Sequence, residues 1–97
     1  MITVNKPGRS KEDLMKSLEK IKTDFSDMIE KYGIKVTQIP DGYNLKGGKK
    51  IVFVDMSVDI NIKAEEGKFV IDYSTKNIPQ GQINEAIKYV EDYLNKQ

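Results

Sequence analysis

Three aspartates in the middle of the chain are the residues whose type and spacing come closest to chemistry. Asp55 and Asp59 lie in one segment of alternating polar and apolar residues, and Asp72 lies in the next. Matching the apolar residues of the two segments sets Asp59 opposite Asp72 on the polar face of a sheet, with Asp55 farther along that face. Such carboxylates suit a hard cation or an acid–base pair. Asp55 and Asp59 would lie roughly 13 Å apart along a strand, too far for one ion, so we expect a solvated face without a metal.

A second group of candidates is basic. Lys46, Lys49 and Lys50 surround Gly47-Gly48 and lie close to Tyr43 in the sequence. A basic patch with an aromatic neighbour suits phosphate or a nucleic-acid strand. The chain balances 16 Lys and Arg against 15 Asp and Glu, a net charge of +1, which disfavours nucleic-acid binding. The glycine pair also lacks the Gly-Lys-Ser/Thr ending of a phosphate-binding loop.

Histidine and cysteine are both absent from the chain. The first absence removes the usual general base near neutral pH and the commonest metal ligand. The second removes thiolate nucleophiles, disulfides and cysteine-containing zinc sites. An enzyme would have to use Asp59 and Asp72, or a lysine with a lowered pKa. We therefore predict no catalytic residue and no cofactor, and expect a protein that is not an enzyme.

Length and composition predict one folded domain. The 97 residues suit a single domain over residues 1–97, and 38% hydrophobic with 32% charged residues suit neither a disordered tail nor a membrane protein. The first eight residues lack the apolar core of a secretory signal, and no apolar stretch has the length of a membrane span. We expect a cytoplasmic location.

The helices that must position these residues are predicted from apolar side chains spaced three and four apart. The first helix should begin at Lys11, with Ser10 as its cap and the Asp13 carboxylate reaching back, and run unbroken to Gly33, a natural left-handed cap. The second should begin near Pro79. Their apolar faces comprise Leu14, Leu18, Ile21, Phe25, Met28 and Tyr32 in the first helix, and Ile83, Ala86, Ile87, Val90 and Leu94 in the second. Tyr89 and Tyr93 are expected to pack their rings between the second helix and the sheet.

Strands are predicted where apolar residues alternate with polar ones. The longest runs from Val52 to Ile62, and another covers residues 69–74. Shorter strands are expected at residues 2–5, 34–39 and 43–45, with a reversal at residues 46–49. Matching of the apolar faces predicts three cross-strand pairs: Ile62 with Phe69, Ile60 with Ile71, and Val58 with Tyr73.

These elements predict an α+β fold. Each element is apolar on one face only, so the economical assembly is a two-layer sandwich. An antiparallel meander sheet of four to five strands would carry two helices on one face, in the order (β)αβββ(β)α.

Ile51, Phe53 and Val70 are apolar exceptions on the sheet face that should point away from the helices. Apolar residues clustered on a wet face can mark an interface. The alternative is that a loop or the N-terminal strand covers them. An open sheet edge allows a similar choice, because the N-terminal segment can block it or a second subunit can pair with it. A homodimer through the edge or the outer face is therefore one of the predicted partners.

The order of the elements resembles that of a known family. The residues that carry the resemblance are Ile2-Thr-Val4, a helix ending Glu30-Lys-Tyr-Gly33, the segment Asp41-Gly-Tyr-Asn-Leu45, and a terminal helix with Ile83, Ile87 and Leu94. In these features the chain resembles the polyhydroxyalkanoic acid system, or granule-region, family of small bacterial proteins. The resemblance implies association with polyester storage granules or their regulation, and no enzymatic residues.

Two functions are compatible with these observations. The first is a non-enzymatic binding module that uses its outer sheet face or a strand edge to bind a protein, a second copy of itself or an apolar surface such as a granule. The alternative is a carrier of a small apolar ligand, held in a cavity between the helices and the sheet.

Overall fold

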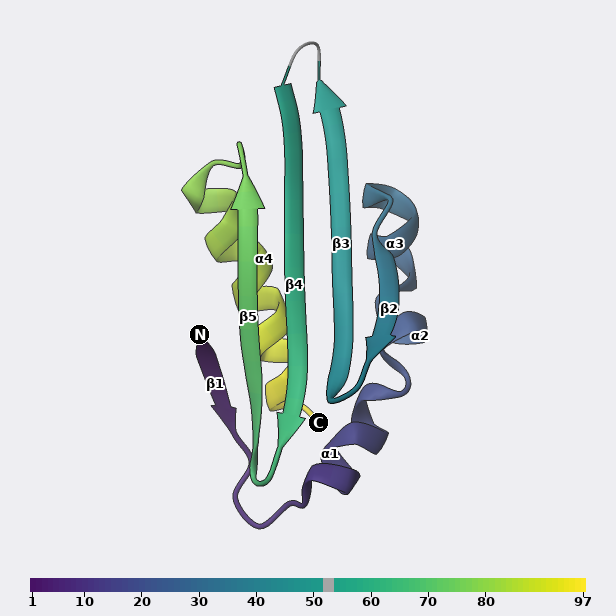
Figure 1. The fold of residues 1–97 in the computed structure, drawn as a ribbon, viewed down its shortest axis with the longest axis vertical. Helices are drawn as coiled ribbons and strands as arrows, with labels where there is room; N and C mark the ends of the chain where they lie inside the picture. Colours follow the sequence, from purple (N-terminus) through teal and green to yellow (C-terminus); the bar gives the residue numbers. More distant parts are fainter. Residues whose placement is uncertain (52–53) are drawn as a thin grey trace.

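The fold is an α+β sandwich of two layers, as the sequence predicts. The computed structural model describes the backbone of residues 1–51 and 54–97, and their side chains except those of residues 32, 49–51 and 54. Its elements, in chain order, are β1 (Ile2–Asn5), α1 (Lys11–Leu18), α2 (Ile21–Asp24), α3 (Ser26–Tyr32), β2 (Lys35–Ile39), β3 (Gly42–Ile51), β4 (Val54–Glu65), β5 (Lys68–Lys76) and α4 (Gln80–Asn95). The strands form one antiparallel sheet in the order β1-β5-β4-β3-β2 (Figure 1).

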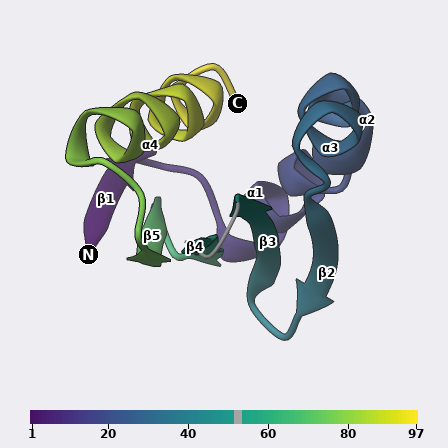
Figure 2. The same ribbon diagram turned by 90° about the horizontal axis from the view of Figure 1, so that it is seen from above.

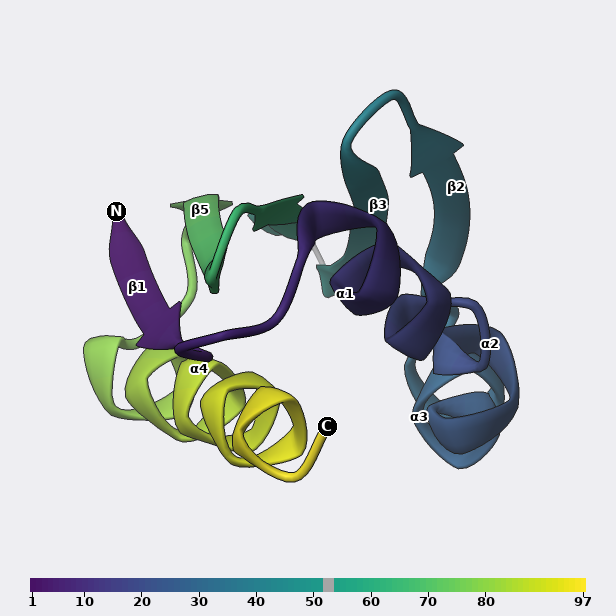
Figure 3. The same ribbon diagram turned by 90° about the horizontal axis from the view of Figure 1, so that it is seen from below.

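All the described helices lie on one side of the sheet. Seen along the strands, α4 lies over the β5 side, whereas α2 and α3 lie over the side of β3 and β2 (Figure 2). The opposite view places α1 between these two groups, at the lower end of the sheet (Figure 3). The helical layer is therefore divided above the middle of the sheet.

The N-terminal segment is a strand, as predicted, and it lies at the sheet edge beside β5. The register pairs Ile2 with Ile71 and Val4 with Phe69. Val4 is 5% exposed and belongs to the core. β1 therefore blocks part of the β5 edge, which was one of the two arrangements that the sequence left open.

The predicted pairing between β4 and β5 is wrong by two residues. Ile62 pairs with Ile71 and Ile60 with Tyr73, so that Asp59 faces Ser74 while Asn61 faces Asp72. Alternation cannot detect a shift of two, because the same faces still match. The turn decides the register: Gly67 has φ +73° and allows a tight connection between Glu65 and Lys68.

The reversal predicted at residues 46–49 is also wrong. β3 continues through Gly47 and Gly48 to Ile51, which pairs with Val54 at the start of β4. Val52 and Phe53, where the long strand was expected to begin, lie outside the described residues. Gly47 serves packing instead of a turn, because a Cβ there would lie 3.3 Å from Cγ1 of Ile34 and 3.5 Å from Cγ1 of Val58.

The first helical region is bent where an unbroken helix was predicted. Lys20 (φ −90°, ψ 10°) and Phe25 (φ −101°, ψ 13°) leave the helical dihedral range and separate α1, α2 and α3. The Ser17 hydroxyl donates to the Leu14 carbonyl oxygen over 2.8 Å, a local bond of a kind that bends helices. The bends accompany continuous burial of the apolar stripe, which comprises Leu14, Leu18, Ile21 and Phe25.

The predicted helix ends are confirmed. Ser10 caps α1 by accepting from the Asp13 backbone N–H over 3.1 Å. The Asp13 carboxylate does not complete a capping box, since it accepts from Arg9 instead. Gly33 ends α3 with φ +63°. Pro79 is the N-terminal cap residue of α4, whose buried face comprises Ile83, Ile87, Val90 and Leu94.

Candidate functional site

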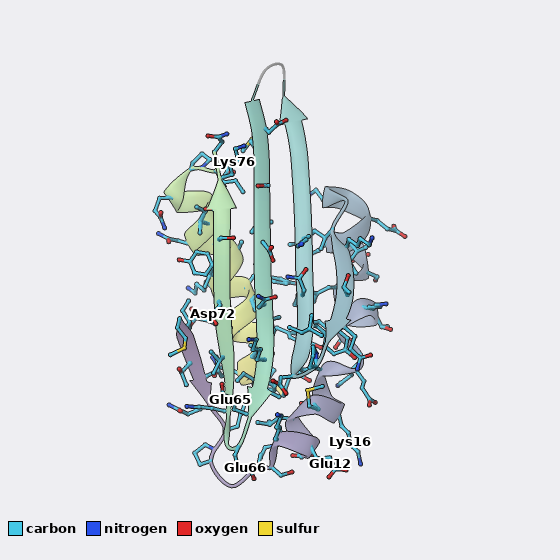
Figure 4. All side chains as sticks on the ribbon, viewed as in Figure 1. Glu12, Lys16, Glu65, Glu66, Asp72 and Lys76 are labelled. Atoms are coloured by element: carbon cyan, nitrogen blue, oxygen red, sulfur yellow. The ribbon has the colours of Figure 1, made fainter. Side chains whose placement is uncertain are left out.

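The structure keeps two of the three predicted aspartates together, since Asp59 and Asp72 line one open hollow of about 220 Å³ on the outer face of the sheet, and Asp55 is not among its lining residues. With Ser74 as its partner on β5, Asp59 accepts from Nδ2 of Asn44 and lies 3.8 Å from Nζ of Lys46. Asp72 is exposed and lies part-way along β5, far from Glu65 and Glu66 at its lower end (Figure 4). Asp55 is exposed near the other end of β4. Among the described residues no group of three acidic, histidine or cysteine side chains could hold a metal ion.

The predicted basic patch is also divided. Lys46 lies within a strand and not in a loop, and its neighbour Tyr43 is buried on the other face of that strand. The side chains of Lys49 and Lys50 lie outside the described residues. The proposed combination of lysines with an aromatic ring is therefore absent at Lys46 and Tyr43.

Of the three residues predicted to form an apolar interface, only Val70 has a described side chain, and that side chain is buried. Val70 faces away from the helices, between Thr3 of β1 and Lys63 of β4, and is only 4% exposed. It therefore presents little surface to a partner. Phe53 and the side chain of Ile51 lie outside the described residues.

A groove lies on the opposite, helix-bearing face of the described molecule. Its volume is about 600 Å³. The floor is formed by Gly47 and Gly48 of β3 and by Met56, Ser57 and Val58 of β4; one wall is formed by Met28 and Ile34; the other is formed by Ile78 and by Gln82, Ile83, Glu85, Ala86, Ile87 and Tyr89 of α4. The lining residues place the groove between α3 and α4, over β3 and β4.

The groove has an apolar base and a polar rim. Met28, Ile34, Met56 and Val58 are half-buried apolar side chains, while Gln82 and Glu85 on α4 are exposed. Methionine side chains are flexible and polarizable, and they adapt to ligands of different shape. The arrangement suits a ligand with an apolar body and a polar end.

An aromatic cluster of Phe25, Tyr89 and Tyr93 ties α4 to the bent helical region beside the groove. The ring of Phe25 lies 4.6 Å from that of Tyr93, edge to face, and 5.5 Å from that of Tyr89. Tyr89 also lines the groove, so the cluster borders it. The tyrosines pack against Phe25 at the bend between α2 and α3, whereas the sequence suggested packing against the sheet.

A hydrogen bond strengthens this tie. The Tyr93 hydroxyl donates to Oδ2 of Asp24 over 2.6 Å. Partial burial of the phenol raises the pKa of Tyr93 well above its ordinary value, and the nearby Asp24 carboxylate raises that pKa further. Tyr93 is consequently a neutral hydrogen-bond donor near neutral pH and not a proton acceptor.

Sequence reasoning assigned no function to the groove residues. Met28 and Ala86 appeared only as members of apolar helix faces, and Met56 and Val58 only as members of an apolar strand face. That pattern is the same for side chains that meet in the core and for side chains that line a gap. The available signal was small size, because Gly47 and Ala86 leave space where a larger residue would have filled it.

No protein-family model matches this chain, and no curated protein or solved structure matches it either. None of the helices in the described ranges combines the length and the apolar character that are needed to cross a bilayer.

Proposed function

We propose that this protein binds and carries a small, mainly apolar molecule in the groove between α3 and α4. The observation that carries the proposal is the groove itself: about 600 Å³, within the range of roughly 300–1,000 Å³ typical of small-molecule sites. Apolar side chains from the sheet and both walls surround it, and polar groups stand at its rim.

The small residues of the groove support this function. A Cβ at Gly47 would lie 3.3 Å from Cγ1 of Ile34, closer than an ordinary van der Waals contact, and 3.5 Å from Cγ1 of Val58, so a side chain there would crowd the wall and the floor of the groove. Ala86 lies on the opposite wall, on the apolar face of α4. An apolar groove of this size with a few polar groups at its rim is typical of a site for a small ligand.

Binding of a neutral fluorescent probe tests the proposal. N-phenyl-1-naphthylamine should become brighter with the wild-type protein and saturate at one site. Ala86→Phe places a ring in the groove and should weaken binding at least tenfold, because the ring and the probe compete for the same volume. Lys88→Phe is the matched control, since it adds the same ring to an exposed position of α4 outside the groove, and should bind as the wild type does.

Two outcomes would overturn the proposal. One is the absence of probe binding together with native mass spectra that show only the bare chain. The other is equal binding by Ala86→Phe and the wild type, which would place the probe elsewhere. Circular dichroism of both variants establishes that they are folded before binding is compared.

The granule association implied by the family resemblance stays a prediction. It required an apolar outer face, and of the three residues predicted there only Val70 has a described side chain, which is buried. Ile39 of β2 lies in the same cross-strand row and is half-buried. Recovery of the protein with the granule layer of fractionated cells would support it, and such recovery would be compatible with an apolar ligand in the groove.

A further inference from the structure

β3 continues for five residues beyond the end of its neighbour β2. The pairing of β2 ends with Lys35 opposite Lys46, whereas β3 pairs with β4 as far as Ile51. Figure 1 shows β3 rising past the top of β2. Residues 47–51 therefore have a strand on one side only within the described sheet. Because alternate residues of an antiparallel strand direct their N–H and C=O groups to the same neighbour, two or three residues present these groups to the unpaired side.

The β3–β4 hairpin has a second edge, on the β4 side, and there a side chain forms a hydrogen bond to the backbone. β4 also extends past its neighbour, since its pairing with β5 ends at Ser57 opposite Lys76. There the side chain of Asn77, held at φ +58°, donates to the Asp55 carbonyl oxygen over 2.8 Å. This bond occupies an acceptor at the β4 end, on the side away from β3.

The charge along the unpaired β3 edge is positive. Lys35 and Lys46 are direct cross-strand partners at the point where β2 ends, and both are exposed. Like charges that face each other directly destabilise a sheet. Lys46 is only 3.8 Å from Asp59, with 66% of its side chain exposed, so this ion pair contributes little. The sequence adds Lys49 and Lys50 to the same strand. In the register of β3 with β4, Lys46 lies opposite Asp59 and Lys50 opposite Asp55, whereas Lys49 lies opposite Met56.

We propose that this edge binds an extended acidic segment of another protein, which adds to the sheet as a strand beside residues 48–51, since Ile34 already packs against the Gly47 position. Main-chain hydrogen bonds would hold the segment in register, as in other cases of strand addition, and its carboxylates would offset the lysines. A second copy of this chain is a poorer occupant. Antiparallel self-pairing centred on this edge would set Lys49 opposite Lys50, which repeats the like-charge contact. The proposal does not depend on the groove ligand.

Fluorescence anisotropy with a labelled Glu-Val-Glu-Val-Glu peptide, blocked at both ends, tests the proposal. The peptide should bind at low salt, and the amide signals of Gly47 and Gly48 should shift in the nuclear magnetic resonance spectrum. Lys46→Glu/Lys49→Glu/Lys50→Glu should bind at least tenfold more weakly. Lys16→Glu/Lys20→Glu/Lys22→Glu makes the same change in net charge at exposed positions on the helical side and should bind at least threefold more tightly than the edge variant.

A second probe separates strand addition from simple charge attraction. The same peptide with alternate backbone nitrogens methylated keeps its carboxylates but cannot form a ladder of hydrogen bonds. It should bind at least tenfold more weakly than the unmodified peptide. Equal binding of the two peptides, equal binding by the two triple variants, or no binding of the unmodified peptide would each overturn the proposal.

Discussion

Gly42 lies so close to the neighbouring strand that the structure leaves no room for a side chain there. A Cβ on Gly42 would lie 1.9 Å from the Ile62 carbonyl oxygen, and backbone atoms cannot move aside cheaply. We expect Gly42→Ala to lower the free energy of unfolding by about 1–3 kcal/mol, the range for overpacking with backbone displacement. Gly81→Ala is the control, because that position in α4 has open space. The control should raise stability by about 0.5–1 kcal/mol. Urea denaturation of both variants measures the difference, and a Gly42→Ala protein as stable as the wild type would contradict this close approach.

The Tyr93 hydroxyl couples stability to alkaline pH. Because burial and the Asp24 carboxylate raise the pKa of Tyr93 above 10.0, the folded state holds the phenol proton more tightly than the unfolded state. The tighter binding of this proton stabilises the folded state by its full amount below pH 10, and the stabilisation declines as the pH rises further. We expect Tyr93→Phe to lower the free energy of unfolding by about 1 kcal/mol at neutral pH. The gap between variant and wild type should narrow above pH 10, as urea denaturation at several pH values would show.

Tyr89→Phe provides the comparison for that measurement. Tyr89 touches Phe25 as Tyr93 does, but its side chain is more exposed. Tyr89 makes the smallest of the contributions that raise the pKa of Tyr93, so loss of the Tyr89 hydroxyl should change the pH dependence of stability less than Tyr93→Phe does. If the stability of Tyr93→Phe depended on pH as that of the wild type does, the hydrogen bond from Tyr93 to Asp24 would not form in solution.

At the scale of elements, the end of α4 depends on the segment that follows β1. Nζ of Lys6 donates to the Asn95 carbonyl oxygen over 2.7 Å, close to the last turn of the helix. A cation there interacts favourably with the helix dipole. Lys6→Ala should lower the free energy of unfolding by about 0.5–1 kcal/mol, whereas Lys88→Ala, at an exposed position of the same helix, should change it by less. Thermal denaturation of both variants shows which substitution costs more stability. Equal losses of stability in Lys6→Ala and Lys88→Ala would contradict a specific role for Lys6.

Local chemistry made the helix ends predictable from the sequence. Ser10, Gly33 and Pro79 act through their own backbone and side-chain properties, so each could be recognised without knowledge of the fold. The bends at Lys20 and Phe25 could not, because no glycine or proline marks them. They arise where packing against the sheet competes with a straight helix.

The strand pairing and the groove show two further limits of the sequence. Alternation established which face of β4 meets the core but could not distinguish registers that differ by two residues, a choice made by Gly67. Gly47 and Gly48 suggested a turn although they lie within β3. The groove was foreseen only as an alternative cavity between helices and sheet. Its walls could not be named, because their separation depends on how α3 and α4 are placed.

At the scale of the whole molecule, the pairing of β1 with β5 sets an order for folding. Val4 meets Phe69 across a long stretch of chain, whereas the β3–β4 and β4–β5 pairs are local. Closing the longer loop costs more conformational entropy, so we expect β1 to dock after the folding transition state. Val4→Ala should mainly accelerate unfolding, and Ile62→Val should mainly slow folding. Stopped-flow kinetics over a range of urea concentrations measures both, and a slower folding rate in Val4→Ala would contradict this order.

The groove takes one wall from Met28 and Ile34, the other from residues between Ile78 and Tyr89, and its floor from residues 47–48 and 56–58, so no single segment of the chain can form it. An occupant would consequently recognise the fully assembled fold and have little affinity for partly folded forms. By mass action, a ligand at a hundredfold excess over its Kd would add about 2.7 kcal/mol to the free energy of unfolding. The concentration of this molecule in the cell would then help to determine how much of the protein escapes proteolysis, and abundance would follow ligand supply.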